Sequence, residues 1–402
     1  MASSAPQASR LAGLLRMPAV SAAMEWLPSH AEWITQRQID LTEIPAPPFG
    51  ESCRARALRD LFEVAGWSPR IDDEGNVIAE TRDAGRGDVV LVSAHLDTAL
   101  APDGPVHVRR EGPRLLAPGI ADNGAGLAAL VALATVFPHA GLRTKLGVVF
   151  AGNVGEEGEG NLRGMRALVA HYGKRLHAAI VVDSASLARI ATTGVASRRL
   201  EAKITGPGGH SWADAGSPNP IHAAARAISH MVAIPLAVNP PSTLNVTVIE
   251  GGTAINAIPD RASIKIDLRS ESESELDRLE SEVRRALDLG ALAERESARG
   301  GASIKMEIRL LGSRPGGRLA SHSALLAAIR EVDGHLGIRA ECMAASTDAN
   351  VPLSLGVPAI CIGAGGTGGR AHTPEEWYDP AGRHVGLQRI LVALLLVAGV
   401  QP

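Results

Sequence analysis

The amino-acid sequence predicts an α/β protein with a doubly wound, mostly parallel sheet, into which a smaller α+β domain is inserted. Continuous apolar stretches alternate with helical patterns in the first half of the chain and return near its end. Between them lie four short stretches in which apolar and polar residues alternate. Strands of the first kind are buried on both faces of a sheet, whereas strands of the second kind have one solvated or polar face. The 402 residues also exceed what one hydrophobic core usually serves, which favours two domains.

Continuous apolar runs are predicted to form the central strands of the α/β sheet. They occupy residues 88–97, 145–153, 178–186 and 357–365. Helical periodicity follows the first two, at residues 124–137 and 162–176. Strands that alternate with helices in this way form a doubly wound layer.

The alternating stretches predict the inserted domain. Its strands are expected at residues 199–206, 244–252, 263–270 and 303–311. Two helical patterns, at 217–232 and 273–287, lie among them. Four antiparallel strands with two helices form a ferredoxin-like, split βαβ arrangement. The predicted boundaries are therefore residues 1–196 and 314–402 for the α/β domain and 197–313 for the insertion.

Composition and charge exclude several classes of function. The formal net charge of -3 and the pI near 6.5 give no basic surface for nucleic acid. Cys53, Cys342 and Cys361 show no CxxC spacing, so neither a disulfide framework nor a thiolate zinc site is indicated. The apolar run at residues 390–400 is shorter than the 20 or so residues that cross a bilayer, and it is predicted to be a buried helix. We therefore expect a cytoplasmic protein without nucleic-acid or membrane partners.

Acidic or histidine side chains follow every predicted buried strand. These residues are His95, Asp97, Glu156, Glu157, Asp183 and His372, and Asp122 lies in a glycine-rich turn that opens a helix. Because ligands bind at the carboxyl ends of strands in open α/β sheets, these side chains are expected at one edge. Each has another interpretation when taken alone; Asp122, for example, could be a helix N-cap. Together, imidazole and carboxylate groups without cysteine suit zinc, manganese or cobalt.

The number of carboxylates predicts two metal ions that share a bridging acid, because one ion needs fewer ligands. Glu156 and Glu157 are adjacent, so on an extended backbone their side chains point in opposite directions. They should therefore not both bind one ion. One is expected to be a ligand and the other a general base on a metal-bound water. The residues alone do not decide which is which.

The motifs around these residues resemble, in order, those of the di-zinc metallopeptidases that include peptidase T, carboxypeptidase G and acetylornithine deacetylase. The motifs are SAHLDTAL, GIADNGAG, GEEGEG, VVDSAS, GPGGHS, INAIPDRASIKIDLR and AHTPEEW. The resemblance covers nearly the whole chain from about residue 35, where EIPAPPFGE also matches. Seven motifs in the family's order and spacing make the resemblance specific.

The resemblance implies a ligand set for two ions. His95, Asp122 and Asp183 would hold one ion, and Asp122, Glu157 and His372 would hold the other. Asp122 is then the bridging ligand. Zinc is the expected metal, and cobalt or manganese also suits these ligands.

The resemblance also assigns roles beside the ions. Glu156 would be the general base and later the proton donor to the leaving amine. Asp97 would orient the ring of His95, as metal-bound histidines usually require. The peptide bond between Asp122 and Asn123 is expected to be cis. Many relatives have a second aspartate at the position of Asn123, and both residues occur in the family.

By the resemblance, the inserted domain is a lid and dimerisation domain, which implies a homodimer. His210 would reach the site of the neighbouring subunit and stabilise the tetrahedral oxyanion. Asn256 and Arg269 would bind the substrate, and Arg269 lies on the polar side of its predicted strand, where it can bind a carboxylate. The alternative for Arg269 is a surface ion pair with Asp267 or Glu271. For His210 it is a histidine in the core of the lid.

The expected function is hydrolysis of a peptide bond in a small substrate by a two-metal exopeptidase. The stretch GGHSWADAGSPNPIHA looks closest to the peptidase T-like branch, which favours di- or tripeptides. An N-acyl amino acid deacylase of the acetylornithine or succinyl-diaminopimelate type is the alternative. A catalytically dead binding protein is disfavoured because no ligand or base is lost. A two-metal phosphoesterase is disfavoured because the motifs supply little Lys or Arg.

Overall fold

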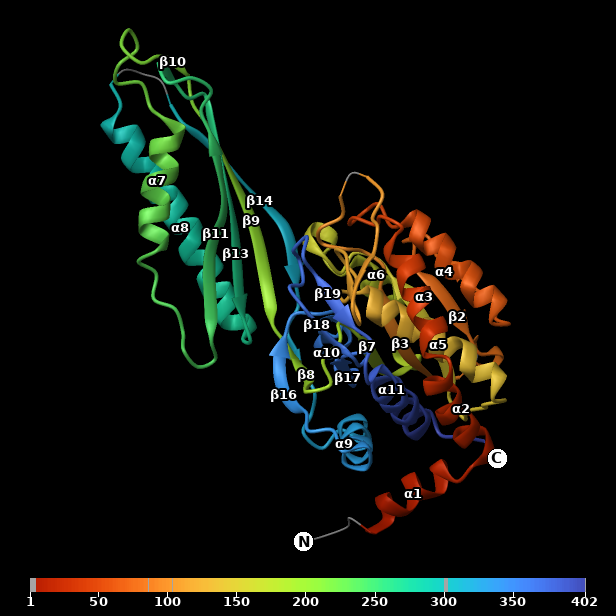
Figure 1. Ribbon diagram of the computed structural model, residues 1–402. Helices are drawn as coiled ribbons and strands as arrows, with labels where there is room; N and C mark the ends of the chain where they lie inside the picture. Colours follow the sequence, from red (N-terminus) through yellow and green to blue (C-terminus); the bar gives the residue numbers. More distant parts are fainter. Residues whose placement is uncertain (1–4, 86, 103, 300–302, 402) are drawn as a thin grey trace. The chain divides into compact units, whose positions relative to one another are not determined.

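The chain divides into two compact units (Figure 1). The computed structural model describes residues 5–85, 87–102, 104–299 and 303–401. The first unit joins Met1–Gly194 to Gly317–Pro402, and the second is the intervening Val195–Gly316. The predicted fold class is confirmed, because one unit has a mostly parallel α/β sheet and the other has a separate antiparallel sheet.

The first unit is built on a nine-stranded sheet with parallel central strands. The predicted apolar runs form β6 (Gly147–Asn153), β3 (Val89–His95), β7 (Leu176–Val182) and β17 (Ala359–Ile362), which are neighbours in this order. Every residue of β3 and β6 is buried, which explains why these segments are continuously apolar. The other strands of the sheet are β1 (Arg70–Ile71), β2 (Val77–Glu80), β8 (Arg189–Gly194), β15 (Gly317–Arg318) and β16 (Glu341–Ala345).

Helices complete the core of this unit. Helices α5 (Gly124–His139), which is almost entirely apolar, and α11 (Arg383–Ala398) pack against β3 and β7. Helix α11 contains residues 390–398 of the predicted buried run. The other helices are α1 (Ala5–Leu15), α2 (Pro18–Ser29), α3 (Ala31–Thr42), α4 (Ser52–Val64), α6 (Arg163–Tyr172), α9 (Ala324–Leu336) and α10 (Asn350–Ser354). Short 3-10 turns lie at Arg82–Gly85, Gly158–Gly160 and Gly173–Arg175. Among the described residues, no helix combines the length and apolar character that a membrane span requires.

A small antiparallel sheet joins two loops of the first unit, one from before the inserted domain and one from after it. Its strands, in spatial order, are β18 (Thr367–Gly369), β19 (Trp377–Asp379), β5 (Arg114–Leu116) and β4 (Arg109–Glu111). This sheet could not be predicted from the sequence, because strands of three residues are too short to show a periodic pattern. The loops that it joins carry Asp122 and His372.

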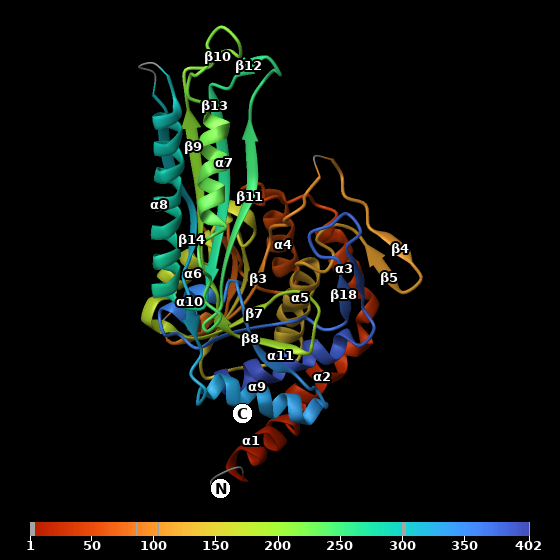
Figure 2. The same ribbon diagram turned by 90° about the vertical axis from the view of Figure 1, so that its left-hand side faces the viewer.

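The second unit has the predicted arrangement of four antiparallel strands and two helices. The strand order is β11 (Ser242–Gly251), β13 (Arg261–Ser270), β9 (Ala196–Thr205) and β14 (Lys305–Arg314). Helices α7 (Pro220–Met231) and α8 (Glu273–Ser297) lie side by side on one face of this sheet, where they bury a separate core (Figure 2). Helix α8 continues beyond the predicted end at residue 287, because Ala291 still packs in the interior. Short strands β10 (Gly209–His210) and β12 (Ala257–Ile258) pair beside this sheet.

Candidate metal centre

Three neighbouring parallel strands of the first unit end in acidic or histidine residues. Strand β3 ends at His95, Glu156 and Glu157 follow β6, and Asp183 follows β7. Because the strands run in the same direction, their carboxyl ends meet at one edge of the sheet. The topology therefore places these four side chains together.

Asp122 lies between two histidines from distant parts of the chain. Its Oδ1 atom is 3.1 Å from His95 Nε2, and its Oδ2 atom is 3.2 Å from His372 Nε2. His95 Nε2 is also 3.8 Å from Asp183 Oδ1, and His372 Nε2 is 2.8 Å from Glu157 Oε1. The structure thus forms two groups of three residues that share Asp122. They are the two groups that the family resemblance implies.

Both groups have the donor atoms and the spacing of a metal site. In each group, one donor atom per residue lies within 4.8 Å of the others. Two ligands at about 2.0–2.1 Å from a tetrahedral zinc ion are about 3.3 Å apart, which is close to the contacts described above. Glu157 Oε1 is buried and makes no hydrogen bond of good geometry among the described residues, although His372 Nε2 is 2.8 Å away. A cation would satisfy both atoms.

The electrostatics of the centre also favour a cation. The carboxylates of Asp122 and Glu157, 3.2 and 2.8 Å from its Nε2 atom, raise the pKa of His372 to about 10. Burial lowers the pKa of His95, but nearby carboxylates outweigh burial and raise it well above its usual value. Burial, followed by the charge of Asp122, raises the pKa of Asp183. Carboxylates that converge in this way repel one another unless protons or cations neutralise them.

Asp97 contacts His95 and the backbone of Glu156 and Glu157. His95 Nδ1 lies 3.0 Å from the backbone carbonyl of Asp97 and 3.6 Å from its carboxylate. The carboxylate oxygens accept the backbone N–H groups of Glu156 at 3.1 Å and of Glu157 at 2.7 Å. The nearest contact to the histidine ring is thus made by the main chain, and the side chain of Asp97 holds the turn that carries both glutamates.

Glu376 is a candidate positioning residue that the sequence motifs did not indicate. Its buried carboxylate accepts the backbone N–H groups of Gly119, Ala121 and Asp122, each at 2.8 Å. Burial raises the pKa of Glu376 to about 7, against the effect of these hydrogen bonds. The available signal was the second glutamate of AHTPEEW, a charged residue directly before an aromatic strand.

The peptide bond between Asp122 and Asn123 is cis, as the resemblance predicts. The Asn123 amide oxygen accepts the N–H group of Gly126 at 3.0 Å and caps α5. Its NH2 group donates to the carbonyl of Val182 at 2.9 Å, directly before Asp183. An ionised aspartate could not donate this second bond. Asparagine therefore ties the loop of one candidate ligand to the strand of another.

The other candidate site residues, His210, Asn256 and Arg269, lie in the second unit. His210 is exposed on β10, which excludes the alternative of a core histidine. Its Nδ1 atom accepts two backbone N–H groups at 3.2 and 3.3 Å, so Nε2 carries the proton of the neutral ring. Asn256 is exposed. Arg269 donates to Asp267 at 2.7 Å, the ion pair that was its alternative interpretation.

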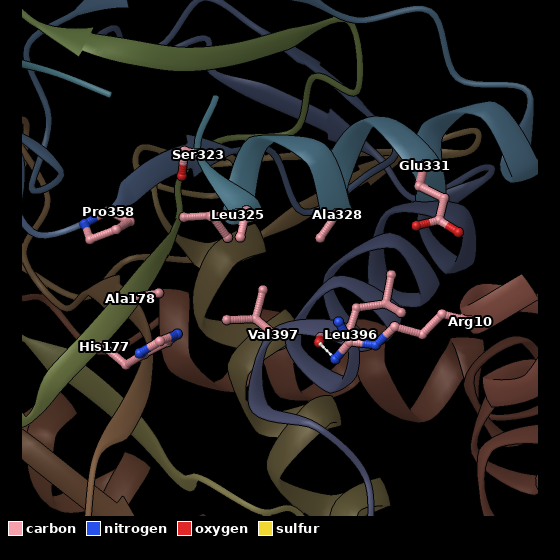
Figure 3. Close-up of a pocket in the computed structure, with 11 residues that line it drawn as sticks. Arg10, His177, Ala178, Ser323, Leu325, Ala328, Glu331, Pro358, Leu396 and Val397 are labelled. Atoms are coloured by element: carbon pink, nitrogen blue, oxygen red, sulfur yellow. Dashed lines mark hydrogen bonds between the residues drawn. The ribbon is translucent and has the colours of Figure 1, made fainter. Parts of the chain in front are cut away.

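A separate cavity of about 340 Å³ lies at the opposite end of β7 (Figure 3). His177, near the start of β7, lines it together with Arg10 and Glu331. Arg10 donates to the carbonyl of Leu396 at 2.6 Å. Because Asp183 follows the other end of β7, the length of the strand separates this cavity from the candidate metal centre.

Comparison with protein families defines the class of this protein. Residues 76–202 match the model described as Peptidase family M28, and residues 190–293 match the model described as Peptidase dimerisation domain. The fold, the candidate ligands and these matches define a hydrolase of peptide or amide C–N bonds. These two partial matches agree with the resemblance of the chain's motifs to the metallopeptidases that include peptidase T.

Individual proteins show how far the similarity extends. The uncharacterized protein YqjE of Bacillus subtilis is 24% identical over 361 residues, which cover 84% of this chain and 91% of that protein. The aminopeptidase PepT structure from Bacillus cereus is 20% identical, with a TM-score of 0.70 over 92% of this chain and 99% of the other. A tripeptidase structure from Staphylococcus aureus is 20% identical, with a TM-score of 0.74 over 92% and 98% of the two chains. At these identities the solved structures establish the shared fold.

Proposed function

We propose that this protein is a two-metal exopeptidase that cleaves di- or tripeptides. One observation carries the proposal: two groups of ligand type share Asp122, and a buried glutamate beside them is left for proton transfer. That glutamate is Glu156, whose carboxylate lies within 4.8 Å of donor atoms of His95 and Glu157.

In the proposed mechanism, His95, Asp122 and Asp183 would hold one divalent ion, and Asp122, Glu157 and His372 would hold the other. These ions would polarise the attacking water and the scissile carbonyl. Zinc suits a site of imidazole and carboxylate groups without cysteine, and cobalt or manganese would also bind.

The remaining chemistry belongs to the side chains. Glu156 would accept a proton from the attacking water as the new C–O bond forms, and return it to the amine as the C–N bond breaks. Asp97 would keep Glu156 in place, since its carboxylate holds the Glu156 backbone N–H at 3.1 Å. Its position favours this role, because Glu156 is buried beside the two groups that share Asp122.

The proposed substrate and assembly rest on similarity. The names of the PepT and tripeptidase structures support short peptides as substrates. The match to a peptidase dimerisation domain supports a homodimer in which His210 serves the partner's site, while Asn256 and Arg269 bind substrate. A cytoplasmic location is part of the proposal.

A substrate panel tests the function. Purified protein loaded with zinc, cobalt or manganese is assayed with di- and tripeptides and with acetylated and succinylated amino acids. We expect the wild type to release the terminal residue from the peptides, and the Glu156→Ala variant to do so at least about 100-fold more slowly. Preference for the acylated amino acids would replace the proposal by deacylation, and no hydrolysis with any metal would contradict it.

A further inference from the structure

A cavity of about 630 Å³ lies beside Asp122 in the first unit. Residues 121–122, 184–189 and 366–371 line it. We call it the arginine pocket, because Arg189 and Arg370 are the two basic residues among its described lining. Small-molecule sites span about 300–1,000 Å³, so the pocket has the size of a ligand site.

Neither arginine of the pocket is neutralised by another residue that the structure describes. Within the described parts of the chain, the guanidinium groups of Arg189 and Arg370 form no hydrogen bond or ion pair, and both side chains are exposed. Elsewhere in the same unit, Arg389 is paired with Asp333 at 2.6 Å. Two unpaired guanidinium groups are therefore available to an anion that enters the pocket.

The backbone that forms the pocket is held in uncommon conformations. Ser184 and Arg370 of the lining have φ angles of 61° and 57°, and His372, directly after the lining, has 61°. These angles lie in the left-handed region that residues other than glycine seldom adopt. Such conformations cluster at functional sites, where the surrounding structure maintains them. Ser184 directly follows Asp183, and Arg370 precedes His372 by two residues. The same loops thus position the candidate ligands and the pocket.

Arg189 also borders a second cavity. This cavity, of about 140 Å³, is lined by Asp183 and Ser184 as well as by Arg189. The arginine therefore lies between the space beside Asp122 and the space beside Asp183. A carboxylate bound to Arg189 would place the rest of its molecule near both candidate ligands.

We infer that the arginine pocket binds a carboxylate of the substrate, through Arg189 and Arg370, and so selects peptides with a free carboxylate near the scissile bond. The inference rests on the proposed function for the identity of that bond. Guanidinium groups bind carboxylates through paired, charge-assisted hydrogen bonds, which a neutral amide reproduces poorly. The carboxylate is either the C-terminal one or that of an acidic side chain.

Matched substrates test this inference. Alanyl-alanine is compared with alanyl-alaninamide, which removes the C-terminal carboxylate, and alanyl-glutamate with alanyl-glutamine, which removes the side-chain carboxylate. We expect wild-type KM to be at least about 10-fold lower for the acid of one pair, as befits charged hydrogen bonds. Arg189→Ala and Arg370→Ala should each raise KM for that acid, with little change in kcat or in KM for the neutral partner. Arg339→Ala removes an exposed arginine outside the pocket and should change neither constant.

The two pairs identify the source of the carboxylate. A preference confined to alanyl-alanine over its amide assigns the pocket to the C-terminus, and a preference for alanyl-glutamate assigns it to an acidic side chain. If the acid preference survives in both arginine variants, or if Arg339→Ala abolishes it equally, the inference is wrong while the peptidase function stands.

A binding measurement separates failure of the inference from failure of the proposed function. Should the wild type hydrolyse no peptide, calorimetry of the metal-loaded protein with succinate and with its neutral diamide still tests the pocket. We expect succinate to bind at least about 10-fold more tightly, and this preference to disappear in the Arg189→Ala/Arg370→Ala double variant. Equal binding of both probes, or an undiminished preference in the double variant, would overturn the inference.

Discussion

Glu156 and Glu157 are neighbours in sequence but have different surroundings. Glu157 Oε1 lies 2.8 Å from His372 Nε2, within the group that contains Asp122. Glu156 belongs to neither of the groups that share Asp122, although it forms a third group of ligand type with His95 and Glu157. The proposed ligand, Glu157, and the proposed base, Glu156, are therefore adjacent residues whose side chains have different partners.

We predict that metal binding and proton transfer separate at this pair. Glu157→Ala should lower the metal content by up to one ion per chain, because it removes a ligand. Glu156→Ala should keep both ions and lower kcat by about 100- to 10,000-fold, the usual contribution of a general base. Elemental analysis and steady-state kinetics measure the two effects, with the exposed Glu159→Ala as the control. If Glu156→Ala loses an ion and Glu157→Ala does not, then Glu156 is the ligand and Glu157 is the base.

Proton release on metal binding is a second prediction at this scale. The pKa of His372 is raised to about 10 and that of His95 is raised by the neighbouring carboxylates, which favours protonated rings in the metal-free protein. A ligating imidazole must lose that proton, so metal affinity should rise with pH from 6 to 8. Calorimetry at pH 7 in buffers of different ionisation enthalpy should show about two protons released per pair of ions. Binding without proton release would contradict the assignment of the histidines as ligands.

At the scale of structural elements, the centre depends on how two loops are held together. The pairing of β19 with β5 brings the segment after His372 to the segment before Asp122. Glu376 then accepts three backbone N–H groups from the loop that ends at Asp122. Gly368 lets these loops approach closely, because a Cβ atom there would lie 3.0 Å from the side chain of Ala121.

We expect Glu376 to act through the loop that carries Asp122. Glu376→Ala leaves three N–H donors without their acceptor, which should lower the free energy of unfolding by about 3 kcal/mol. Metal affinity should fall by about 10- to 100-fold, as when a residue that supports a ligand is removed. Metal titration and thermal denaturation measure these effects, and Glu375→Ala, an exposed neighbour, is the matched control. Unchanged metal affinity would limit Glu376 to a structural role.

At the scale of the whole molecule, the second unit offers surfaces for self-association. Strands β11 and β14 are the edges of its sheet, and natural proteins cover or pair such edges. Ile249 on β11 and Leu310 on β14 are each more than half exposed, at 57% and 53%. The match to a peptidase dimerisation domain at residues 190–293 includes β11 but ends before β14.

Mixed dimers test whether His210 serves the partner's site. If it does, a dimer of one His210→Ala chain and one Glu156→Ala chain has one site with both defects and one intact site. Random mixing makes half of the dimers mixed, so activity should recover to about a quarter of the wild-type value. Sedimentation velocity establishes the dimer, and activity after subunit exchange is the measurement.

The control mixes Glu156→Ala with Glu157→Ala. Both residues belong to the same edge of the first unit, so each site of that mixed dimer keeps one defect and no activity should return. If activity returned in this control mixture, recovery of activity would not be evidence that one chain contributes a residue to the site of the other. If subunits exchange between the His210→Ala and Glu156→Ala proteins and no activity returns, His210 acts within its own chain or has no role in catalysis.

Local patterns determined the architecture and most of the candidate centre. Burial on both faces makes β3 and β6 continuously apolar, and parallel strands share one carboxyl edge. His95 and Asp183 could therefore be assigned to one edge before any tertiary contact was known. The pairing of each ligand with its ion came from the family resemblance, because periodicity does not report distances between strands.

Only the tertiary structure showed which residues support the candidate metal centre and which cavity lies next to it. Glu376 is separated from Gly119 by 257 positions, and Arg189 and Arg370 line one cavity from different loops. Contacts of this kind have no signature within a single segment, since periodicity reports only which face of that segment is buried. They arise when three-residue strands pair and close packing brings their loops together. For that reason the sequence predicted the candidate ligands of this protein, whereas the arginine pocket became visible only in the fold.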